Sequence, residues 1–388
     1  MKKIFSLVIA FCCCVALFAC GGKDNNTIEV AFIGNLSGGA KYYGEQVKMG
    51  AELALKEINA AGGVSVDFEG GKIKKQMKFI VKDDAGDATQ AAQVYNQVKG
   101  KVCAVIGPVL SGAAESVANL CQKDGMPMIT PSGSAESLTK GRDFVFRTCL
   151  TDPGQGTYIA NFAEEQGYTT AVILKNSGSA YASGVCEYFV AQASNVGIEV
   201  VKTLEYTDEN YLATLDQLAQ QVVDANADVI VCPDYTKVNA AFAEAVHKLD
   251  ENQVFVGADG WDSIVTAAEV DAIYLNNCYF TNNLFSGDKS ENIVNFYKNF
   301  KTEYNTDDIS AFAALAYDAV YVLAKAIEDA GSTDKAAIKT AIQKVNLVGI
   351  TGNITFDANG NPQRDVPIIQ IVDGEYVLKT KVTAGKEE

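Results

Sequence analysis

The sequence predicts an α/β protein of two lobes, each a doubly wound sheet of parallel strands covered by helices on both faces. Two series of apolar, β-branched runs alternate with segments of helical period, the pattern of parallel strands and crossover helices. The chain of 388 residues is longer than one hydrophobic core usually supports. No linker rich in proline, glycine or serine separates the two series, so we expect several short crossings that act as a hinge.

The first series begins with a strand at 28–34, followed by a helix within 44–63. Apolar residues of the second segment recur at helical spacing, and the pair Gly62-Gly63 ends it. The remaining strands of this series are predicted in the runs KFIVKD (78–83), VCAVIG (102–107) and MPMIT (126–130).

The second series follows the segment FVFRTCLTDPGQG. Its predicted strands are AVILK (171–175), IEVVKTLEY (198–206), DVIVC (228–232) and VFVGA (254–258). The C-terminal part departs from the alternation. It predicts two amphipathic helices, within 309–331 and 334–345, and then strands in 349–379 joined by Asn-Gly and Asp-Gly turns.

The N-terminus has the pattern of an export signal. Lys2 and Lys3 precede an apolar stretch that is shorter than the ~20 residues of a membrane-spanning helix, so residues 1–19 are predicted to be a signal peptide. Leu17-Phe18-Ala19-Cys20 resembles a bacterial lipobox, in which Cys20 is lipidated; the bulky Phe18 leaves ordinary signal cleavage as the alternative. Residues 20–27 would then tether an exported protein to the bacterial cell membrane, on its extracytoplasmic or periplasmic side.

Composition excludes several functions. The net charge is −16, and −18 without Lys2 and Lys3, which disfavours nucleic acid and anionic membrane surfaces as partners. The single histidine, His247, argues against Ser–His catalysis and multi-histidine metal sites, and we expect it on the solvated face of a helix. The segment DANGN begins like an EF-hand loop, but Ile368 stands at its twelfth position, so a hairpin turn is predicted. No phosphate-binding glycine motif is present.

The cysteines beyond Cys20 show no C-x-x-C spacing, which argues against zinc and thioredoxin-like sites. We expect buried free thiols, with disulfides as the alternative. These cysteines are Cys103, Cys121, Cys149, Cys186, Cys232 and Cys278.

Small or polar residues follow several predicted strands, where open α/β sheets bind ligands. Ser111 opens a helical segment, whose N-terminal N–H groups attract a carboxylate, although serine is also a common N-cap. Ser132-Gly133-Ser134 either admits a ligand to the backbone or forms an ordinary turn. Asp259 either pairs with an ammonium group or caps a helix or turn. Tyr181 and Tyr235 either cover an aliphatic ligand or are structural.

From residue 28 to about residue 378, the chain resembles the leucine/isoleucine/valine-binding family of type I periplasmic binding proteins, the receptors of ABC importers. Five segments in order carry the resemblance: IGNLSGGAKYYGEQVKMGAELALKEINAAGG, KDDAGDATQAAQVYNQV, VIGPVLSGAAESVANLCQKDGMPMITPSGSAESLT, FRTCLTDPGQG and GNITFDANGN. The resemblance implies a three-crossing hinge between lobe 1 (28–149 and 281–351) and lobe 2 (150–280 and 352–388).

The resemblance also implies roles for the residues that match the family's motifs. The Ser111 hydroxyl would take a ligand carboxylate, and Ser132, Gly133 and Ser134 would flank the ligand. Asp259 would pair with its ammonium group, at a position where the branched-chain receptors have a glutamate. Aromatic positions of the family fall on Tyr181 and Tyr235 in lobe 2 and on Tyr43 at the cleft mouth of lobe 1.

The implied function is an extracytoplasmic receptor that encloses a branched-chain or similar small amino acid by hinge closure and presents it to ABC permease subunits. It is expected to be a monomer held at the membrane by its lipid, without enzymatic activity, cofactor, metal or nucleic-acid partner. The alternative is a sensor subunit for an amino acid or amide with no transport role.

Overall fold

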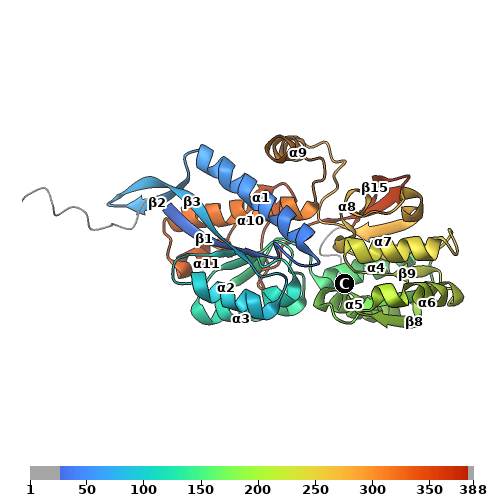
Figure 1. Ribbon diagram of the computed structural model, residues 1–388. Helices are drawn as coiled ribbons and strands as arrows, with labels where there is room; N and C mark the ends of the chain where they lie inside the picture. Colours follow the sequence, from blue (N-terminus) through green and yellow to red (C-terminus); the bar gives the residue numbers. More distant parts are fainter. Residues whose placement is uncertain (1–26, 383–388) are drawn as a thin grey trace, which may run out of the picture.

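The computed structural model describes residues 27–382 and contains two large sheets, which lie side by side in two lobes (Figure 1). The predicted signal peptide (1–19), the predicted lipidation site Cys20, the tether up to residue 26 and residues 383–388 lie outside the described residues. Within residues 27–382, no helix is both long and apolar enough to cross a membrane.

The first lobe is built on a sheet with the strand order β2-β3-β1-β4-β5-β6. Strands β3, β1, β4, β5 and β6 run parallel, and β2 pairs antiparallel with β3 at the edge. Helices α1, α10 and α11 cover one face, and α2 and α3 cover the other, so this lobe is doubly wound as predicted. The bounds are β1 Thr27–Gly34, α1 Lys41–Ala60, β2 Val64–Phe68, β3 Gly71–Asp83, α2 Ala88–Val98, β4 Val105–Ile106, α3 Ser111–Asp124, β5 Met128–Thr130, η1 Glu136–Leu138, β6 Val145–Arg147, α9 Glu291–Tyr304, α10 Ala311–Ala330 and α11 Lys335–Ile342.

The second lobe holds a sheet with the order β15-β14-β11-β10-β9-β7-β8. Its strands from β11 to β8 are parallel, with α4 and α5 on one face and α6 and α7 on the other. Strands β14 and β15 add an antiparallel edge. The bounds are α4 Asp152–Glu165, β7 Thr170–Asn176, α5 Ala180–Val196, β8 Glu199–Tyr206, α6 Tyr211–Asp224, β9 Val229–Val231, α7 Thr236–His247, β10 Phe255–Gly257, η2 Asp259–Trp261, α8 Ile264–Ala267, η3 Ala272–Leu275, β11 Cys278–Thr281, β14 Val366–Val372 and β15 Glu375–Val382.

The chain passes between the lobes three times: from β6 to α4, from β11 to α9, and from the small hairpin β12 (Leu347–Gly349)–β13 (Gly352–Ile354) to β14. We call these passages the first, second and third crossing. The residue boundaries of the lobes given above stay a prediction.

Both sheets are mixed, because each ends in an antiparallel hairpin. The hairpin β14–β15 was predicted from Asp373-Gly374, and both residues have positive φ, 50° and 79°, as a tight two-residue hairpin requires. The hairpin β2–β3, which turns at Glu69-Gly70, was not predicted. The second half of β3 was predicted as the run 78–83. The edge strand β2 is short and the first half of β3 is lysine-rich and largely exposed, so neither has the continuous apolar run of a central strand.

The six cysteines within the described residues are buried and unpaired, as predicted. The expectation for His247 was wrong: it is only 6 % exposed, and its ring packs edge-on against Phe255. Its two ring nitrogens lie 2.6 Å from the Tyr274 carbonyl and 2.9 Å from the Gln253 carbonyl. The helix end on which it lies is covered by η3, a neighbour that the local sequence does not reveal.

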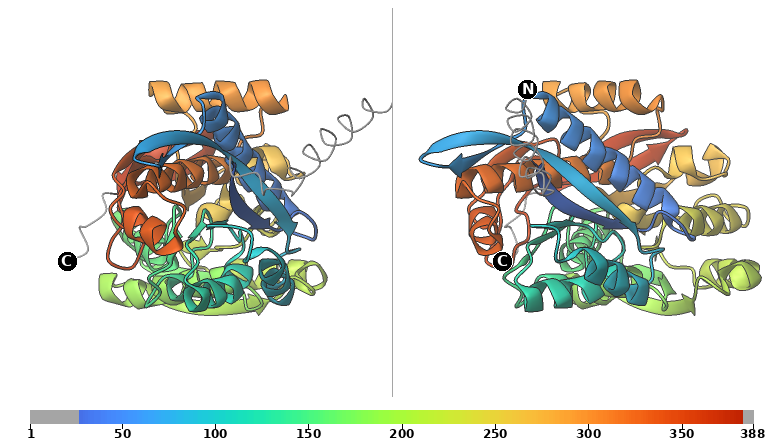
Figure 2. Two further views of the ribbon diagram at one scale, coloured as in Figure 1. Left: turned by 90° about the vertical axis from the view of Figure 1, so that its left-hand side faces the viewer. Right: turned by 60° about the vertical axis from the view of Figure 1, so that its left-hand side comes forward.

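Helix α1 crosses α10 in close contact (Figure 2). A methyl group at Gly50 would lie 1.9 Å from the Ala313 carbonyl oxygen, so the helices approach each other through a bare glycine. We expect Gly50→Ala to lower the free energy of unfolding by about 1–3 kcal/mol, because the helices must separate. Urea denaturation measures this, with Gly112→Ala in α3 as the control, since nothing lies within 4 Å of its added methyl. Equal stability of the two variants would contradict this packing.

Candidate ligand-binding site

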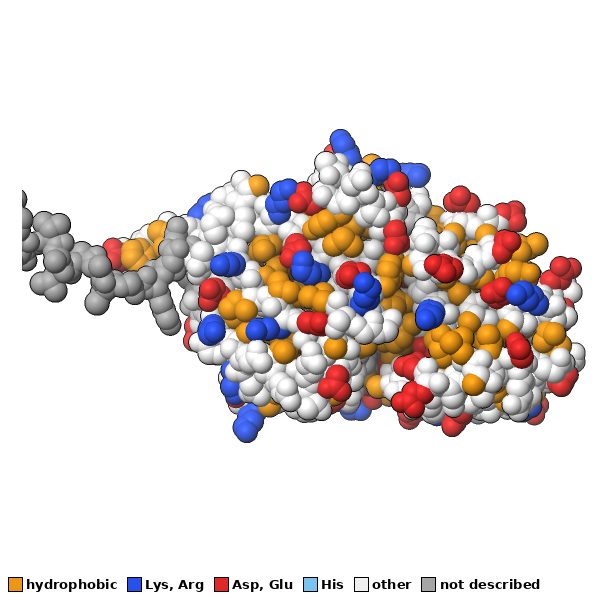
Figure 3. All heavy atoms as spheres, in the orientation of Figure 1, with side chains coloured by type: hydrophobic (Ala, Val, Ile, Leu, Met, Phe, Trp, Pro, Cys, Tyr) orange, Lys and Arg blue, Asp and Glu red, His pale blue; other side chains and the backbone are white. Residues whose placement is uncertain are grey.

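A small cavity lies where the two lobes meet, at the carboxyl ends of the strands. Its volume is about 10 Å³, room for about one water molecule, so a larger ligand must displace the side chains around it. The space-filling view shows hydrophobic side chains along the seam between the lobes (Figure 3). Residues from both lobes line the cavity: Tyr43, Val109, Leu110, Ser132, Ser134, Tyr181, Tyr235, Asp259 and Phe312.

The first lobe contributes serines that follow β4 and β5. Ser132 and Ser134 line the cavity, and the Ser132 hydroxyl donates to the Val109 carbonyl at 2.8 Å. Ser111 is the first residue of α3 and lies behind them, because its hydroxyl accepts from the Ser134 N–H at 3.2 Å. Ser111 therefore does not line the cavity itself, but its hydroxyl holds the backbone of Ser134, which does.

Gly133 faces the interior of the first lobe. Its N–H donates to the Thr130 hydroxyl at 2.8 Å, and its carbonyl accepts from the Arg147 guanidinium at 3.0 Å. A side chain on Gly133 would press against Leu138 and Ala114. Its place in the fold is thus a packing position between two cavity-lining serines.

The second lobe contributes Asp259, which follows β10 and is only 2 % exposed. The carboxylate accepts from Gln155 Nε2 at 3.1 Å, from the Tyr181 hydroxyl at 3.0 Å and from Asn283 Nδ2 at 2.9 Å. No cation bonds it within the described residues, and burial raises its pKa to about 6 despite these donors. The Asp259 carboxylate is therefore a buried, negatively charged hydrogen-bond acceptor that its three donors hold in one orientation.

Aromatic rings fill the wall between the serines and Asp259. Tyr181 stacks on Tyr235 with centroids 5.3 Å apart, and Tyr235 lies 5.0 Å from Tyr43. Tyr43 also meets Phe312 edge-on at 5.3 Å. The Tyr181 hydroxyl both donates to Asp259 and accepts from the Gly260 N–H, so this tyrosine is held by two bonds. Such a wall suits the aliphatic part of a ligand.

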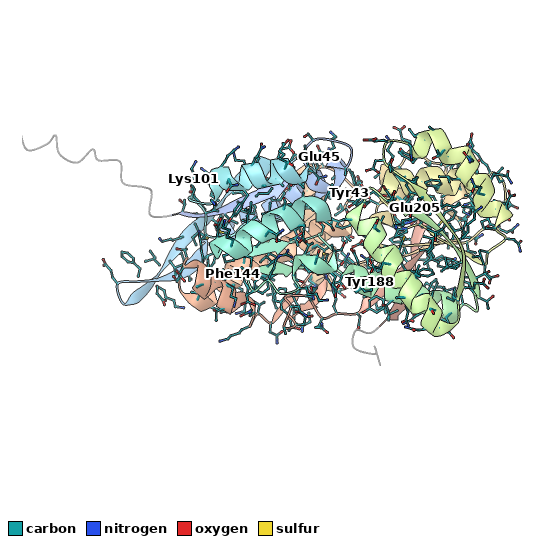
Figure 4. All side chains as sticks on the ribbon, turned by 90° about the horizontal axis from the view of Figure 1, so that it is seen from below. Tyr43, Glu45, Lys101, Phe144, Tyr188 and Glu205 are labelled. Carbon is teal, nitrogen blue, oxygen red and sulfur yellow. The ribbon has the colours of Figure 1, made fainter. Side chains whose placement is uncertain are left out.

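Hydrogen bonds across the seam hold the lobes together around the cavity. The Tyr43 hydroxyl, from α1, donates to the Gly260 carbonyl at 2.9 Å and accepts from the Thr236 N–H at 2.8 Å. Elsewhere along the seam, the Tyr188 hydroxyl donates to Glu136 at 2.6 Å. Both tyrosines lie at the junction of the lobes in Figure 4.

Asp262 makes a second kind of contact across the seam. Its carboxylate accepts from the Ser310 hydroxyl at 2.6 Å and from the Ala311 N–H at 2.8 Å, at the N-terminus of α10 in the first lobe. Asn282 binds its other oxygen at 2.8 Å. A carboxylate of one lobe thus caps a 20-residue helix of the other, where the helix dipole favours negative charge.

Several residues of the site were not predicted. Val109, Leu110 and Phe312 line the cavity, and Gln155 and Asn283 orient Asp259. Leu110 adjoins Ser111, and Gln155 lies in the segment TDPGQG, so proximity to recognised motifs could have found both. Phe312 and Asn283 come from distant parts of the chain that only the folded topology brings here.

Desolvation raises the pKa of six buried carboxyl groups within residues 27–382: to about 6 for Asp84, Asp234 and Asp259, to about 7 for Asp152, and above the ordinary value for Asp262 and Asp318. These pKa values exceed the ordinary value of 3.8, which applies to the unfolded chain. Between pH 3.8 and about pH 7, the folded protein therefore binds more protons than the unfolded chain. Stability is therefore lost as pH rises through the window. We expect the free energy of unfolding without ligand to be at least about 1 kcal/mol greater at pH 5 than at pH 8. Urea denaturation at both pH values tests this; greater stability at pH 8 would contradict it.

The described residues contain no group of three or more histidine, cysteine or acidic side chains able to hold a metal ion. In the segment DANGN, the Asp357 carboxylate accepts from the N–H groups of Asn359 and Asn361, both at 2.8 Å. This carboxylate closes its own turn.

Two α/β lobes, three crossings and a cavity with polar groups from both lobes define a two-lobed solute receptor. The chain belongs to the periplasmic binding protein family, whose model matches residues 27–375. This is a family of extracytoplasmic solute-binding receptors.

Relatives and solved structures agree with this assignment. Leu/Ile/Val-binding protein BraC3 of Rhizobium johnstonii is 30% identical over 358 residues, which cover 89% of this chain and 92% of the relative. The leucine-, isoleucine-, valine-, threonine-, and alanine-binding protein of Pseudomonas aeruginosa is 27% identical, covering 89% and 90%. The branched-chain amino acid transporter substrate binding protein LivJ of Streptococcus pneumoniae, solved with isoleucine, superposes with a TM-score of 0.81 at 28% identity, covering 92% and 98%.

Proposed function

We propose that this protein captures a small aliphatic amino acid, such as leucine, isoleucine or valine, in the interlobe cavity and presents it to the permease of an ABC importer. The observation that carries the proposal is the polarity of the cavity. A buried carboxylate from one lobe faces serines and the N-terminal end of α3 on the other, with aromatic rings between them. The printed names of the relatives and the isoleucine complex of LivJ support the same ligand class.

The proposed binding mode follows from charge. The ligand ammonium group would donate to Asp259, as a charge-assisted hydrogen bond. The ligand carboxylate would lie against Ser132, Ser134 and the start of α3, where the Ser134–Ser111 pair can redirect its donors toward the ligand. The side chain would then contact the tyrosines and Phe312.

The remaining features of the proposal concern the cell surface. The predicted signal peptide and Cys20 support export and lipid anchoring, and anchoring would keep the receptor close to its permease. We propose a monomer that binds its ligand without chemical change, which makes it a receptor and not an enzyme. Palmitate labelling with a Cys20→Ala control tests the anchor.

Thermal denaturation with a panel of ligands tests the ligand class. L-leucine, L-isoleucine and L-valine are expected to raise Tm, because they bind the folded protein alone. Two analogues serve as controls: 4-methylpentanoate lacks the ammonium group and leucinamide lacks the carboxylate, so neither should raise Tm comparably. No shift with any aliphatic amino acid, or an equal shift with 4-methylpentanoate, would overturn the proposal.

A further inference from the structure

Behind Asp259, away from the cavity, a hydrogen-bonded path leads to all three crossings. We propose that Asn283 and Arg364 are positioning residues that couple the Asp259 carboxylate to the hinge, so that ligand engagement of Asp259 and the arrangement of the crossings depend on each other. The ligand side of this inference rests on the proposed function.

Asn283 is the first member of the path. It lies just after β11, in the second crossing, and is only 3 % exposed. Its Nδ2 donates to Asp259 at 2.9 Å, while its Oδ1 accepts from the Leu150 N–H of the first crossing at 3.0 Å. One carboxamide therefore contacts the ligand acceptor with one end and the hinge backbone with the other. A rotation that changes either bond changes both.

Arg364 is the second member, and it joins the crossings to one another. It lies in the third crossing and is 8 % exposed. Its guanidinium donates to the Thr148 carbonyl of the first crossing, to Asn283 Oδ1 of the second at 3.3 Å, and to the Thr351 carbonyl at 3.5 Å. A planar guanidinium with several donors suits this task, whereas a single ammonium group cannot reach all three acceptors.

Charge connects the two ends of the path. The acceptors that Arg364 contacts are neutral oxygens, and Asp259 and Asp318 are the acidic groups whose field acts on it. Asp259 likewise has no bonded cation within the described residues. Arg364 and an ammonium ligand are therefore both attracted to the negative charge of Asp259. Asn283, which bonds both Asp259 and Arg364, lies between them. This competition gives the hinge a means to respond to the occupied cavity.

The crossings have room to respond. A groove open to solvent lies beside the hinge, lined by residues of the second and third crossings, Asn283 and Arg364 among them, and by the hairpin β12–β13, which includes Thr351. Lys381 lines the same groove and pairs weakly with Asp288 at 3.9 Å, and within residues 27–382 it makes no hydrogen bond to Asn283. It offers a matched control, since it is a cation in the same groove but outside the path.

A double-mutant cycle measured by calorimetric titration with L-leucine tests the coupling. Arg364→Lys and Asn283→Ala are each expected to weaken L-leucine binding about tenfold, although Arg364 does not line the cavity. The affinity of the double variant should equal that of the single variant with the larger loss, because the two residues belong to one path and their effects are not additive. Lys381→Met should match the wild type. Wild-type affinity in Arg364→Lys, or additive losses in the double variant, would overturn the coupling.

A second readout needs no ligand. Asp259→Asn is expected to accelerate amide hydrogen exchange in residues 148–151 several-fold, because it alters the partner of Asn283. Asp234→Asn removes an equally buried carboxylate from the same lobe and should leave that exchange unchanged. In the Asn283→Ala background the effect of Asp259→Asn should be lost, because Asn283 joins Asp259 to the Leu150 N–H; persistence of the full effect would refute the path. If the wild type binds no amino acid, the proposed function fails, whereas this exchange experiment still decides the coupling.

Discussion

Asp259→Asn is expected to weaken L-leucine binding at least a hundredfold at pH 7.5. The substitution keeps the size of the side chain but removes the negative charge that faces the cavity. The carboxylate is buried, with neutral donors only, so an ammonium ligand supplies its first directly bonded cation. Losing one partner of a desolvated charge pair typically costs roughly 2–5 kcal/mol. Calorimetric titration measures the change.

The control for this prediction is Asp234→Asn. Asp234 is as buried as Asp259 and bonds Asn176, Tyr206 and the Tyr235 N–H, but it does not line the cavity. Its replacement should leave the affinity within a few-fold of the wild type. A protein that binds leucine equally well with asparagine at position 259 would exclude Asp259 as the ammonium partner.

The same charge predicts how binding depends on pH. Burial raises the pKa of Asp259 to about 6, so the carboxyl is ionised at pH 7.5 and becomes protonated below pH 6. The affinity for a zwitterionic ligand should therefore fall as pH decreases through 6, while the stability of the ligand-free protein rises.

Asp262→Ala is expected to weaken leucine binding tenfold or more, although Asp262 does not line the cavity. The substitution removes two hydrogen bonds that join the lobes, to Ser310 and to the Ala311 N–H, and it removes the negative charge at the N-terminus of α10. It therefore lowers the population of the closed arrangement, and apparent affinity falls with that population. Phe312 follows the cap directly and lines the cavity, so the position of this ring should also loosen.

X-ray scattering and calorimetry together measure this effect. The Asp262→Ala variant should have a larger radius of gyration than the wild type, both with and without leucine. Asp228→Ala is the matched control, because its carboxylate accepts from Thr169 and Thr170 within one lobe only. An Asp262→Ala variant as compact as the wild type, with unchanged affinity, would show that this contact does not hold the lobes.

Local patterns carry most of the fold. Buried central strands appear as apolar runs, and the Asp373-Gly374 turn identifies its hairpin because both residues must adopt positive φ. The hairpin β2–β3 escaped prediction because the short β2 and the exposed, lysine-rich first half of β3 have no apolar run, although the run 78–83 identified the second half of β3. His247 escaped because its partners Tyr274 and Gln253 come from η3 and a loop, which cover its helix only in the folded lobe.

The candidate site shows the same limit. Strand ends identified Ser132, Ser134 and Asp259, since a parallel sheet brings these ends together. Spacing could not distinguish Ser134, which lines the cavity, from Ser111 and Gly133, which lie behind it. Phe312 and Asn283 are brought to the site by the three crossings of the chain between the lobes, and no local sequence pattern predicts these crossings.

The central claim, that the interlobe cavity binds a zwitterionic amino acid between Asp259 and the serines of the first lobe, is tested most directly by a crystal structure of the protein with L-leucine. We predict one leucine in the cavity, with its ammonium group within hydrogen-bond distance of Asp259 and its carboxylate at Ser132, Ser134 and the start of α3. Leucine bound outside this cavity, or bound there with its ammonium group directed away from Asp259, would contradict the claim.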